Sequence, residues 1–322
     1  MILVTGASGF IGKNFVVEAI KNKQKIRILA RPATRLSFTK NQNGVEIVHA
    51  DFYTGQNLDT ALKNVRQVIH CAGLTMGRNF VEFYRANVLA TVNLVSAMKR
   101  SGVKKILFLS SQSAGGPSRS STSMDETVPA APVSFYGLTK KMAEDVIINS
   151  ELDYIILRPC SVYGPFDTEI LKFIKLLNAG FYLCIGREEK LINMLYVEDL
   201  INLMHLIVKN NYFPHKSYYV TDGTCYFFDD VVRLILKSLK RERYLRVHIP
   251  KSIALLLGLF NDLVLPRKMR LAGFDKMKEM MQNCWLCSNE KIIGDTGWRP
   301  KYDLKTGMEK TLDWYRKNGY LA

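Results

Sequence analysis

Three side chains in the middle of the chain have the types and the spacing needed to move a proton. Tyr136 and Lys140 are four residues apart, so on a helix they share one face, about one turn apart. An ammonium group in that position stabilises the tyrosinate and lowers the tyrosine pKa from about 10 towards the range used in general acid–base catalysis. Ser111 follows an apolar segment and can donate a hydrogen bond to the same substrate oxygen. We expect Tyr136 to transfer the proton, Lys140 to tune it and Ser111 to orient a carbonyl or an alcohol.

The first twelve residues have the layout of a phosphate-binding turn. Residues 2–4 form a short apolar run typical of a buried strand, and Gly6, Gly9 and Gly12 follow at intervals of three, ahead of apolar positions with helical spacing. Residues without a Cβ atom let the backbone turn tightly and approach a pyrophosphate, which the helix N-terminus can bind through its amides. We expect a dinucleotide site here; the alternative is a glycine-containing turn that binds no ligand.

Strand-like and helical segments alternate up to about residue 165. Apolar strands are expected at 25–30, 45–49, 65–71, 105–109 and 153–158. This alternation predicts an α/β fold with a doubly wound parallel sheet, a Rossmann domain, over residues 1–165. Residues 166–322 are less regular, with helices expected near 168–178, 197–209, 227–240 and 306–317 and strands near 181–185, 217–221 and 244–249. We expect them to form mainly a smaller substrate-binding lobe, with some segments returning to the sheet.

The end of the second strand indicates which cofactor is preferred. In dinucleotide folds an acidic residue near this point accepts hydrogen bonds from the adenosine ribose, whereas an arginine suits a 2′-phosphate. Arg31 and Arg35 follow the strand here, and no acidic residue does. The sequence therefore favours NADP, with NAD as the alternative, because surface arginines also serve other roles.

The order of these features resembles the extended branch of the short-chain dehydrogenase/reductase superfamily, the NAD-dependent epimerase/dehydratase family. Tyr-x-x-x-Lys occurs by chance in many helices. It supports the resemblance only because it stands in the expected order among the other motifs. The motifs are Thr5-Gly-x-x-Gly-x-x-Gly12, His70-Cys-Ala-Gly73, Ser111, Tyr136-x-x-x-Lys140 and Arg158-Pro159, with looser landmarks at Tyr196-Val-Glu-Asp-Leu200 and Gly294-Asp-Thr-Gly-Trp298. The resemblance implies hydride transfer to or from a nicotinamide, with Lys140 also holding its ribose. Together with the two arginines, the cofactor-binding residues are then Gly6, Ser8, Gly9, Phe10, Ile11, Gly12, Arg31, Arg35, Asp51, Phe52, Cys71, Ala72, Gly73, Asn87, Tyr136, Lys140, Pro159 and Cys160.

Several of these positions have further roles to test. Asp51 and Phe52, which the resemblance places beside the adenine, precede a helix expected at 55–63 that Asp51 could cap. Asn87, within a helix expected from Phe80 to Lys99, is expected to tie down backbone near the active site. His70 is expected to be a packed residue rather than a metal ligand. The stretch 112–134, rich in Gly, Ser and Pro, is expected to be a functional or mobile loop.

The resemblance also favours one branch of the superfamily. Ser110-Ser-Gln-Ser-Ala-Gly-Gly-Pro117 looks like the corresponding segment of the 3β-hydroxysteroid dehydrogenase and dihydroflavonol reductase group. Those enzymes interconvert a secondary alcohol and a ketone on bulky, steroid-, flavonoid- or lipid-like substrates. Enzymes acting on nucleotide sugars usually have an arginine shortly before the Tyr196 landmark, where this chain has Lys190 and, further away, Arg187. We expect an oxidoreductase of the first kind; the alternatives are a nucleotide-sugar 4-epimerase or dehydratase with tightly bound NAD, and a non-catalytic cofactor-sensing protein.

The chain of 322 residues has a formal net charge of +16. Such a surface can attract phosphate-bearing ligands, anionic membranes or nucleic acid, or can serve solubility alone. The chain has no zinc-finger spacing and no stacking motif with basic interleaving, so we expect no nucleic-acid partner. Basic residues flank the apolar run 253–260 within 237–278, a pattern that suits peripheral contact with an anionic membrane. The alternative is an ordinary buried helix with a solvated basic rim.

The remaining expectations concern the compartment and the partners. The six cysteines are scattered and are expected to be buried free thiols; Cys284-x-x-Cys287 has no second pair, so we expect no metal site. No signal peptide is recognised, and no apolar run reaches the roughly 18–20 residues that span a bilayer. We expect a cytoplasmic protein, at most peripheral to a membrane. The resemblance implies a homodimer formed through helices near 79–99 and 135–149.

Overall fold

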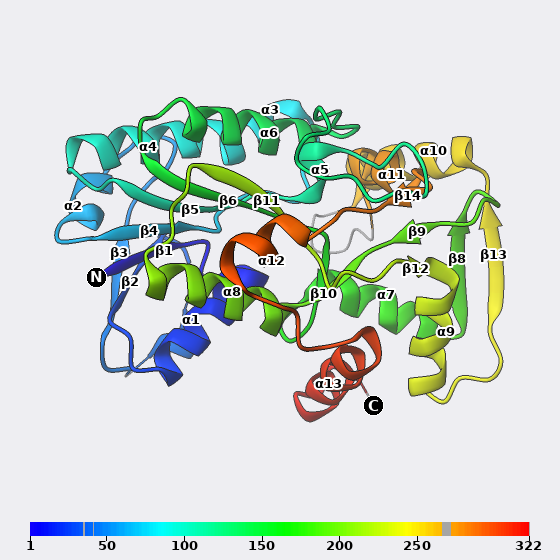
Figure 1. The fold of residues 1–322 in the computed structure, drawn as a ribbon. Coiled ribbons are helices and arrows are strands. Elements are labelled where there is room, and N and C mark those ends of the chain that lie inside the picture. Colours follow the sequence, from blue (N-terminus) through cyan, green and yellow to red (C-terminus); the bar gives the residue numbers. More distant parts are fainter. Residues whose placement is uncertain (35, 41, 266–271, 322) are drawn as a thin grey trace.

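A parallel sheet forms the centre of the protein. The structure is a computed structural model, and it describes residues 1–34, 36–40, 42–265 and 272–321. Within these residues the sheet has seven strands in the order β11-β6-β5-β4-β1-β2-β3, all pairs parallel (Figure 1). The strands are β1 (Ile2–Thr5), β2 (Ile26–Ala30), β3 (Val45–His49), β4 (Gln67–His70), β5 (Lys105–Leu109), β6 (Asp153–Pro159) and β11 (Lys216–Val220). The predicted doubly wound α/β fold is confirmed.

Helices cover both faces of this sheet. On one face α1 (Phe10–Lys21) packs on α8 (Val197–Asn210), and on the other α4 (Ala90–Arg100) lies between α2 (Leu58–Leu62) and α6 (Phe135–Ile148) (Figure 1). Leu3 and Val4 are both fully buried, but Leu3 belongs to the core under α4 and Val4 to the core under α8. Burial on both faces explains why the strand reads as a continuous apolar run.

The helix expected from Phe80 to Lys99 is present but changes its winding. It begins as α3 (Phe80–Phe83), continues as the π-helical η2 (Tyr84–Leu89) and ends as α4. Single π-helical turns within α-helices are frequent at functional sites. Asn87 lies inside this turn.

A smaller lobe is built from later segments around its own apolar core. Its helices α7 (Thr168–Asn178), α9 (Phe228–Ser238) and α13 (Leu304–Lys317) contribute Ile174, Ile235 and Leu312 to that core. Its strand pairs and short sheet are β8 (Phe181–Ile185) with β13 (Leu245–Ile249), β7 (Ser161–Tyr163) with β10 (Met194–Tyr196), and β9 (Leu191–Ile192) between β12 (Tyr226–Phe227) and β14 (Cys284–Trp285). The other elements are η1 (Ser37–Thr39), α5 (Gln112–Gly115), α10 (Lys251–Val264), α11 (Phe274–Met280) and α12 (Glu290–Thr296).

The stretch 112–134 is held in place by a segment far along the chain. It begins with the short helix α5, and the Ser118 N–H donates to the Cys284 carbonyl at 3.1 Å. Met124 then exchanges backbone hydrogen bonds with Leu286 and Ser288. All three hydrogen bonds join backbone atoms, which is why the composition of the loop does not reveal them.

The cysteines differ in exposure more than expected. All six are free, but only Cys160 and Cys287 are buried, and Cys225 is exposed. In the part of the chain that the structure describes, no helix combines the length and the apolar character needed to cross a bilayer.

Candidate active site

The glycine turn between β1 and α1 is as tight as its sequence predicts. Gly6 has a φ of +72°, and a Cβ there would lie 2.5 Å from the carbonyl carbon of Cys71. A Cβ on Gly12 would lie 2.3 Å from the Gly6 carbonyl oxygen. Ser8 and Gly9 are exposed at the turn, whereas Phe10 and Ile11 pack partly against the core. Since α1 has neither a side-chain cap nor an acidic residue in its first turn, its N-terminus suits the pyrophosphate of a dinucleotide.

The end of β4 lies directly beside this turn. The Thr5 hydroxyl oxygen is 2.7 Å from Nδ1 of His70, and Nε2 of His70 is 3.1 Å from the Thr91 hydroxyl. Burial, with a smaller effect of Lys140, lowers the pKa of His70 to about 3, so the imidazole is neutral. His70 is therefore a packed residue that links β1, β4 and α4. The Ala72 N–H donates to Thr5 Oγ1 at 3.1 Å, which fixes the path of Cys71, Ala72 and Gly73.

Asn87 ties the π-helical turn to the chain after β4, as predicted. Its Oδ1 accepts from the Leu74 N–H at 2.7 Å, and its Nδ2 donates to the Leu74 carbonyl and to the Thr139 hydroxyl. A Cβ on Gly73 would lie 3.2 Å from Asn87 Oδ1 and 3.3 Å from Lys140 Nζ. The structure thus brings Gly73, Asn87 and Lys140 together, three residues that the sequence analysis assigned to the cofactor.

Lys140 is a buried cation. Its side chain extends from α6 to the sheet, where Nζ donates to the Leu109 carbonyl at 2.7 Å and lies 4.6 Å from the centroid of the Phe108 ring. The residue is 5% exposed, and burial lowers its pKa to about 8. Lys140 therefore remains charged at neutral pH but releases its proton more readily than an exposed lysine.

Tyr136 and Ser111 are brought together, but the tyrosine is not tuned as predicted. Loss of hydration raises the pKa of Tyr136 to about 12, although a hydrogen bond with Ser111 and the charge of Lys276 lower it. The Lys140 ammonium group donates to the Leu109 carbonyl. The predicted lowering of the Tyr136 pKa is therefore wrong for this structure, because burial outweighs the effects that lower it. The Tyr136 hydroxyl stays protonated at neutral pH and can donate a proton.

The first turn of α6, which carries Tyr136, is held by α11. The Asp275 carboxylate accepts from the backbone N–H groups of Phe135 and Tyr136 at 2.6 and 3.0 Å. Glu279, one turn later on α11, accepts from the Ser134 hydroxyl at 2.7 Å and pairs with Lys276 at 2.8 Å. Nothing in the sequence pattern pointed to these three residues. Their only signal is the i, i+4 spacing of the two carboxylates, and it does not reveal which helix they contact.

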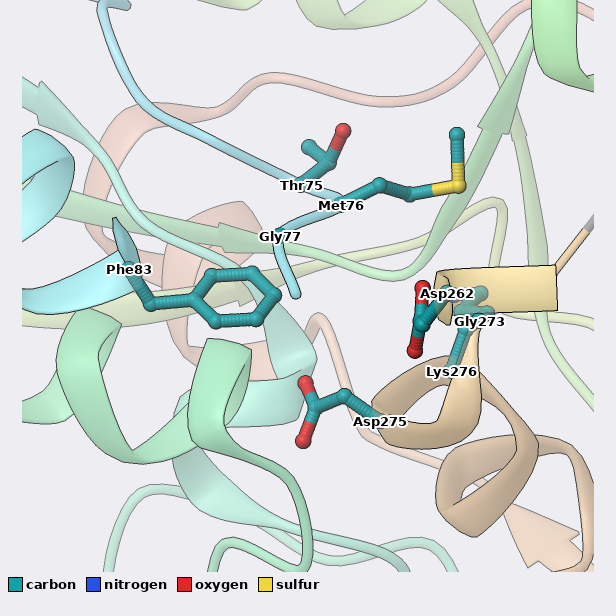
Figure 2. Close-up of a pocket in the computed structure, with 8 residues that line it drawn as sticks. All are labelled: Thr75, Met76, Gly77, Phe83, Asp262, Gly273, Asp275 and Lys276. Carbon is teal, nitrogen blue, oxygen red and sulfur yellow. The ribbon is translucent and has the colours of Figure 1, made fainter. Parts of the chain in front are cut away.

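A small cavity lies beside these groups. It encloses about 10 Å³, room for about one water molecule. Thr75, Met76 and Gly77 line it together with Phe83, and α10 and α11 close it from the other side through Asp262, Gly273, Asp275 and Lys276 (Figure 2). The ring centroids of Phe83 and Tyr136 are 6.4 Å apart. The cavity therefore adjoins the candidate proton donor and is walled by the α10–α11 pair.

The residues assigned to the adenosine end lie after β2 and β3. Arg31 is exposed immediately after β2, and Phe52 is buried. The Asp51 carboxylate accepts from the Tyr53 N–H at 2.7 Å, whereas the residue that precedes α2 is Asn57. The alternative in which Asp51 caps that helix is therefore wrong. Arg35 lies outside the described residues.

Pro159 and Cys160 lie at the carboxyl end of β6. Pro159 pairs with Val220 of β11, and the Cys160 N–H donates to the Val220 carbonyl at 3.0 Å. Burial raises the pKa of the Cys160 thiol, so it is neutral. The neighbouring Arg158 makes two hydrogen bonds to Glu144, at 2.9 and 2.6 Å, and both residues are buried. Arg158 thus connects the sheet to α6.

Comparison with known proteins agrees with this geometry. Residues 2–220 match the model of the NAD dependent epimerase/dehydratase family. A ceramide reductase of Caulobacter vibrioides is 25% identical over 100% of this chain and 96% of its own length. A putative UDP-glucose 4-epimerase of Methanocaldococcus jannaschii is 30% identical over 99% of both chains. Among solved structures, MoeE5 in complex with UDP-glucuronic acid and NAD has a TM-score of 0.77 at 23% identity, covering 98% of this chain and 99% of its own.

The family match covers more than half of the chain and includes the glycine turn, Ser111, Tyr136 and Lys140. The relative at 30% identity extends the similarity over almost the full length of both proteins. The chain belongs to the NAD dependent epimerase/dehydratase family, in the extended branch of the short-chain dehydrogenases/reductases, and is an NAD-dependent enzyme.

Proposed function

We propose that the enzyme interconverts a secondary alcohol and a ketone on a bulky, apolar molecule, with NADP(H) as its preferred cofactor. The observation that carries this choice over a nucleotide sugar is the position of Lys190. This lysine is the nearest basic residue before the Tyr196 landmark, and its Nζ donates to the Met280 carbonyl. A side chain engaged in holding the end of α11 is poorly placed to bind a diphosphate. The similarity to a ceramide reductase also supports a lipid-like substrate.

The side chains suit the proton half of this reaction. A reduced nicotinamide supplies the hydride when bound. Ser111 would donate a hydrogen bond to the ketone oxygen, and the Tyr136 hydroxyl would give its proton to the same oxygen, which with the hydride completes the alcohol. Lys140, charged and close to Gly73, holds the nicotinamide ribose. Because burial keeps Tyr136 protonated at neutral pH, this side chain can act as the proton donor when a ketone is reduced.

The preference for NADP is argued from the end of β2. Arg31 is exposed there, and the nearest acidic residue after β3, Asp51, accepts a backbone hydrogen bond in its own turn. Calorimetric titration of the cofactor-stripped protein with NADPH and NADH, alongside Arg31→Ala, tests the preference. We expect tighter binding of NADPH and a loss on the order of 1.5 to 3 kcal/mol in the variant, since a charge-assisted contact disappears. Equal binding of the two cofactors would remove the NADP assignment.

A nucleotide-sugar 4-epimerase or dehydratase is the second candidate, favoured by the 30% identity to a putative UDP-glucose 4-epimerase. The two candidates differ in cofactor balance, because an epimerase returns the hydride to its substrate and consumes no cofactor overall. One assay follows the absorbance of the reduced cofactor in the presence of a panel of bulky apolar ketones. A separate assay measures whether the enzyme converts UDP- and dTDP-sugars. Stoichiometric oxidation of NADPH by a ketone supports the proposal. Conversion of a nucleotide sugar without net oxidation overturns it.

Tyr136→Phe distinguishes both enzymes from a non-catalytic cofactor-sensing protein. The variant lacks the proton donor, so we expect it to bind cofactor normally and to lose about 10²- to 10⁴-fold in turnover. Retention of the cellular role by this variant would contradict an enzymatic function.

A further inference from the structure

The outward face of α10 is apolar, the reverse of an ordinary surface helix. Its inward side, with Ala254, Gly258 and Asp262, is buried against α11. At about 100° per residue the exposed apolar side chains cover an arc of roughly 160° on the opposite side. Within this described helix no charged side chain interrupts that arc. Its members, each between 44% and 75% exposed, are Ile253, Leu256, Leu257, Leu259, Phe260, Leu263 and Val264.

The exposed apolar face of α10 is expected to contact a partner or a membrane. Soluble proteins rarely leave a contiguous apolar patch of this kind in water unless it meets a partner or a membrane. Figure 1 places α10 at the rim of the molecule, beside α11 and away from the β2–β3 edge of the main sheet. With 14 residues the helix is about 21 Å long, too short to span a bilayer and long enough to lie in the interface.

The positive charge of residues 237–278 indicates which kind of partner the apolar face of α10 contacts. Residues 237–278 contain eleven basic and three acidic residues, which is half of the net charge of +16. Lys237, Lys240, Arg241 and Arg243 are exposed at the end of α9 and before β13, and the length of β13 separates them from α10 (Figure 1). The predicted basic residues Arg267, Lys268 and Arg270 lie outside the described residues. A basic protein with an exposed apolar helix is attracted to an anionic lipid surface by both of its properties.

We propose that α10 docks this enzyme on the surface of an anionic lipid bilayer. The apolar arc enters the interface, and the positive charge holds the protein near lipid headgroups. This inference rests in part on the proposed function, because an enzyme at a bilayer has direct access to a lipid-like substrate.

The docking helix is also connected to the candidate active site. Asp262, on the inward side of α10, accepts from the Phe274 N–H at 2.7 Å. The next residue, Asp275, accepts from the Tyr136 N–H. Asp262 and Asp275 both line the cavity beside Tyr136 (Figure 2). Two hydrogen bonds, one from Phe274 to Asp262 and one from Tyr136 to Asp275, thus connect α10 through α11 to the proton donor.

Sedimentation of the full-length protein with vesicles tests the proposal without substrate or cofactor. Vesicles of phosphatidylcholine, with or without about a third phosphatidylserine, separate a lipid-headgroup effect from apolar binding alone. The test variant is Leu256→Gln with Leu263→Gln. Its control, Ile47→Gln with Val128→Gln, removes two other exposed apolar side chains, which are 42% and 37% exposed.

We expect the wild type and the control to bind the anionic vesicles and the α10 variant to bind at least about tenfold more weakly. Equal binding of the α10 variant would overturn the proposal. So would a change in sedimentation mass of the α10 variant without lipid, because a second copy of the chain would then cover this face. NADPH binding and turnover of a water-soluble ketone, measured on the same variants, separate a failed membrane contact from a failed assignment of the enzyme.

Discussion

At the scale of single residues, Lys140 shows how a candidate catalytic group is placed at a cost to stability. Its ammonium group is almost completely buried, and its one described hydrogen bond goes to the Leu109 carbonyl. Burial lowers its pKa from 10.5 to about 8. A shift of this size corresponds to about 3 kcal/mol of penalty for the charged form in the folded state. The neighbouring Cys71 and Glu144 raise the pKa and so offset part of this penalty.

Replacing Lys140 with Met should stabilise the protein and abolish its activity. Methionine fills a similar space without a charge, so we expect the free energy of unfolding at pH 7 to rise by about 1–2 kcal/mol once the lost hydrogen bond is counted. Between pH 8 and 10.5, Lys140 of the wild type is deprotonated in the folded state and still protonated in the unfolded state. The free energy of unfolding of the wild type therefore rises with pH over this range, and its difference from the variant disappears. Urea unfolding at several pH values measures this.

The control is Lys63→Met at an exposed position, where we expect little change and no such dependence on pH. A Lys140→Met protein less stable than the wild type at pH 7 would show that the charge supports the fold.

At the scale of elements, the β1–turn–α1 unit is fixed by backbone contacts that leave no room for side chains. Gly6 approaches the chain after β4, and Gly12 approaches the carbonyl group of Gly6. The helix can therefore start close to the sheet with its amides directed outward. Gly294 in α12 is the opposite case, since a Cβ there would meet no atom within 4 Å and its φ is not positive.

Substitution by alanine should therefore have opposite effects at these two glycines. Gly12→Ala places a Cβ 2.3 Å from a backbone oxygen, and relieving that clash should cost about 1–3 kcal/mol of stability and weaken cofactor binding. Gly294→Ala should stabilise the protein by about 0.5–1 kcal/mol, because glycine is a poor helix residue. Thermal unfolding and cofactor titration of both variants check this. A stable Gly12→Ala that binds cofactor normally would show that the turn is not the phosphate site.

The elements also show what the sequence can and cannot predict. The strands of the main sheet and most helices were predictable within a few residues, because their apolar periodicity is local. The docking of Asp275 on Tyr136 was not, since the contact joins segments 139 residues apart and either partner reads as an ordinary helix residue. The engagement of Lys190 with Met280 is equally non-local. The sequence placed Tyr136 and Lys140 correctly on one helix, yet the direction of the tyrosine pKa depended on burial, which spacing does not report.

At the scale of the whole molecule, two apolar surfaces lie on different parts of the protein. One is the face of α10. The other lies on the helices that cover one face of the main sheet, where Val81 and Val92 on α3 and α4 and Leu138 and Ile148 on α6 are between 36% and 53% exposed. These helices coincide with the segments that the family resemblance assigned to a dimer. The basic 237–278 segment contains α10 and not α4 or α6. We therefore propose that α10 meets the lipid and that a second copy of the chain packs on the α4–α6 face.

A charge on the α4–α6 face should separate the two copies. Val92→Arg introduces a cation into the proposed contact between two copies of the α4–α6 face, where burial of an unpaired charge is strongly unfavourable. We therefore expect sedimentation at micromolar concentration to give the mass of one chain. Ile47→Arg, on β3 at the sheet edge, is the control and should leave the mass of the wild type unchanged. Vesicle binding of Val92→Arg should persist, because α10 is untouched. A wild-type mass of one chain would contradict the dimer, and an unchanged mass for Val92→Arg would move the contact to another surface.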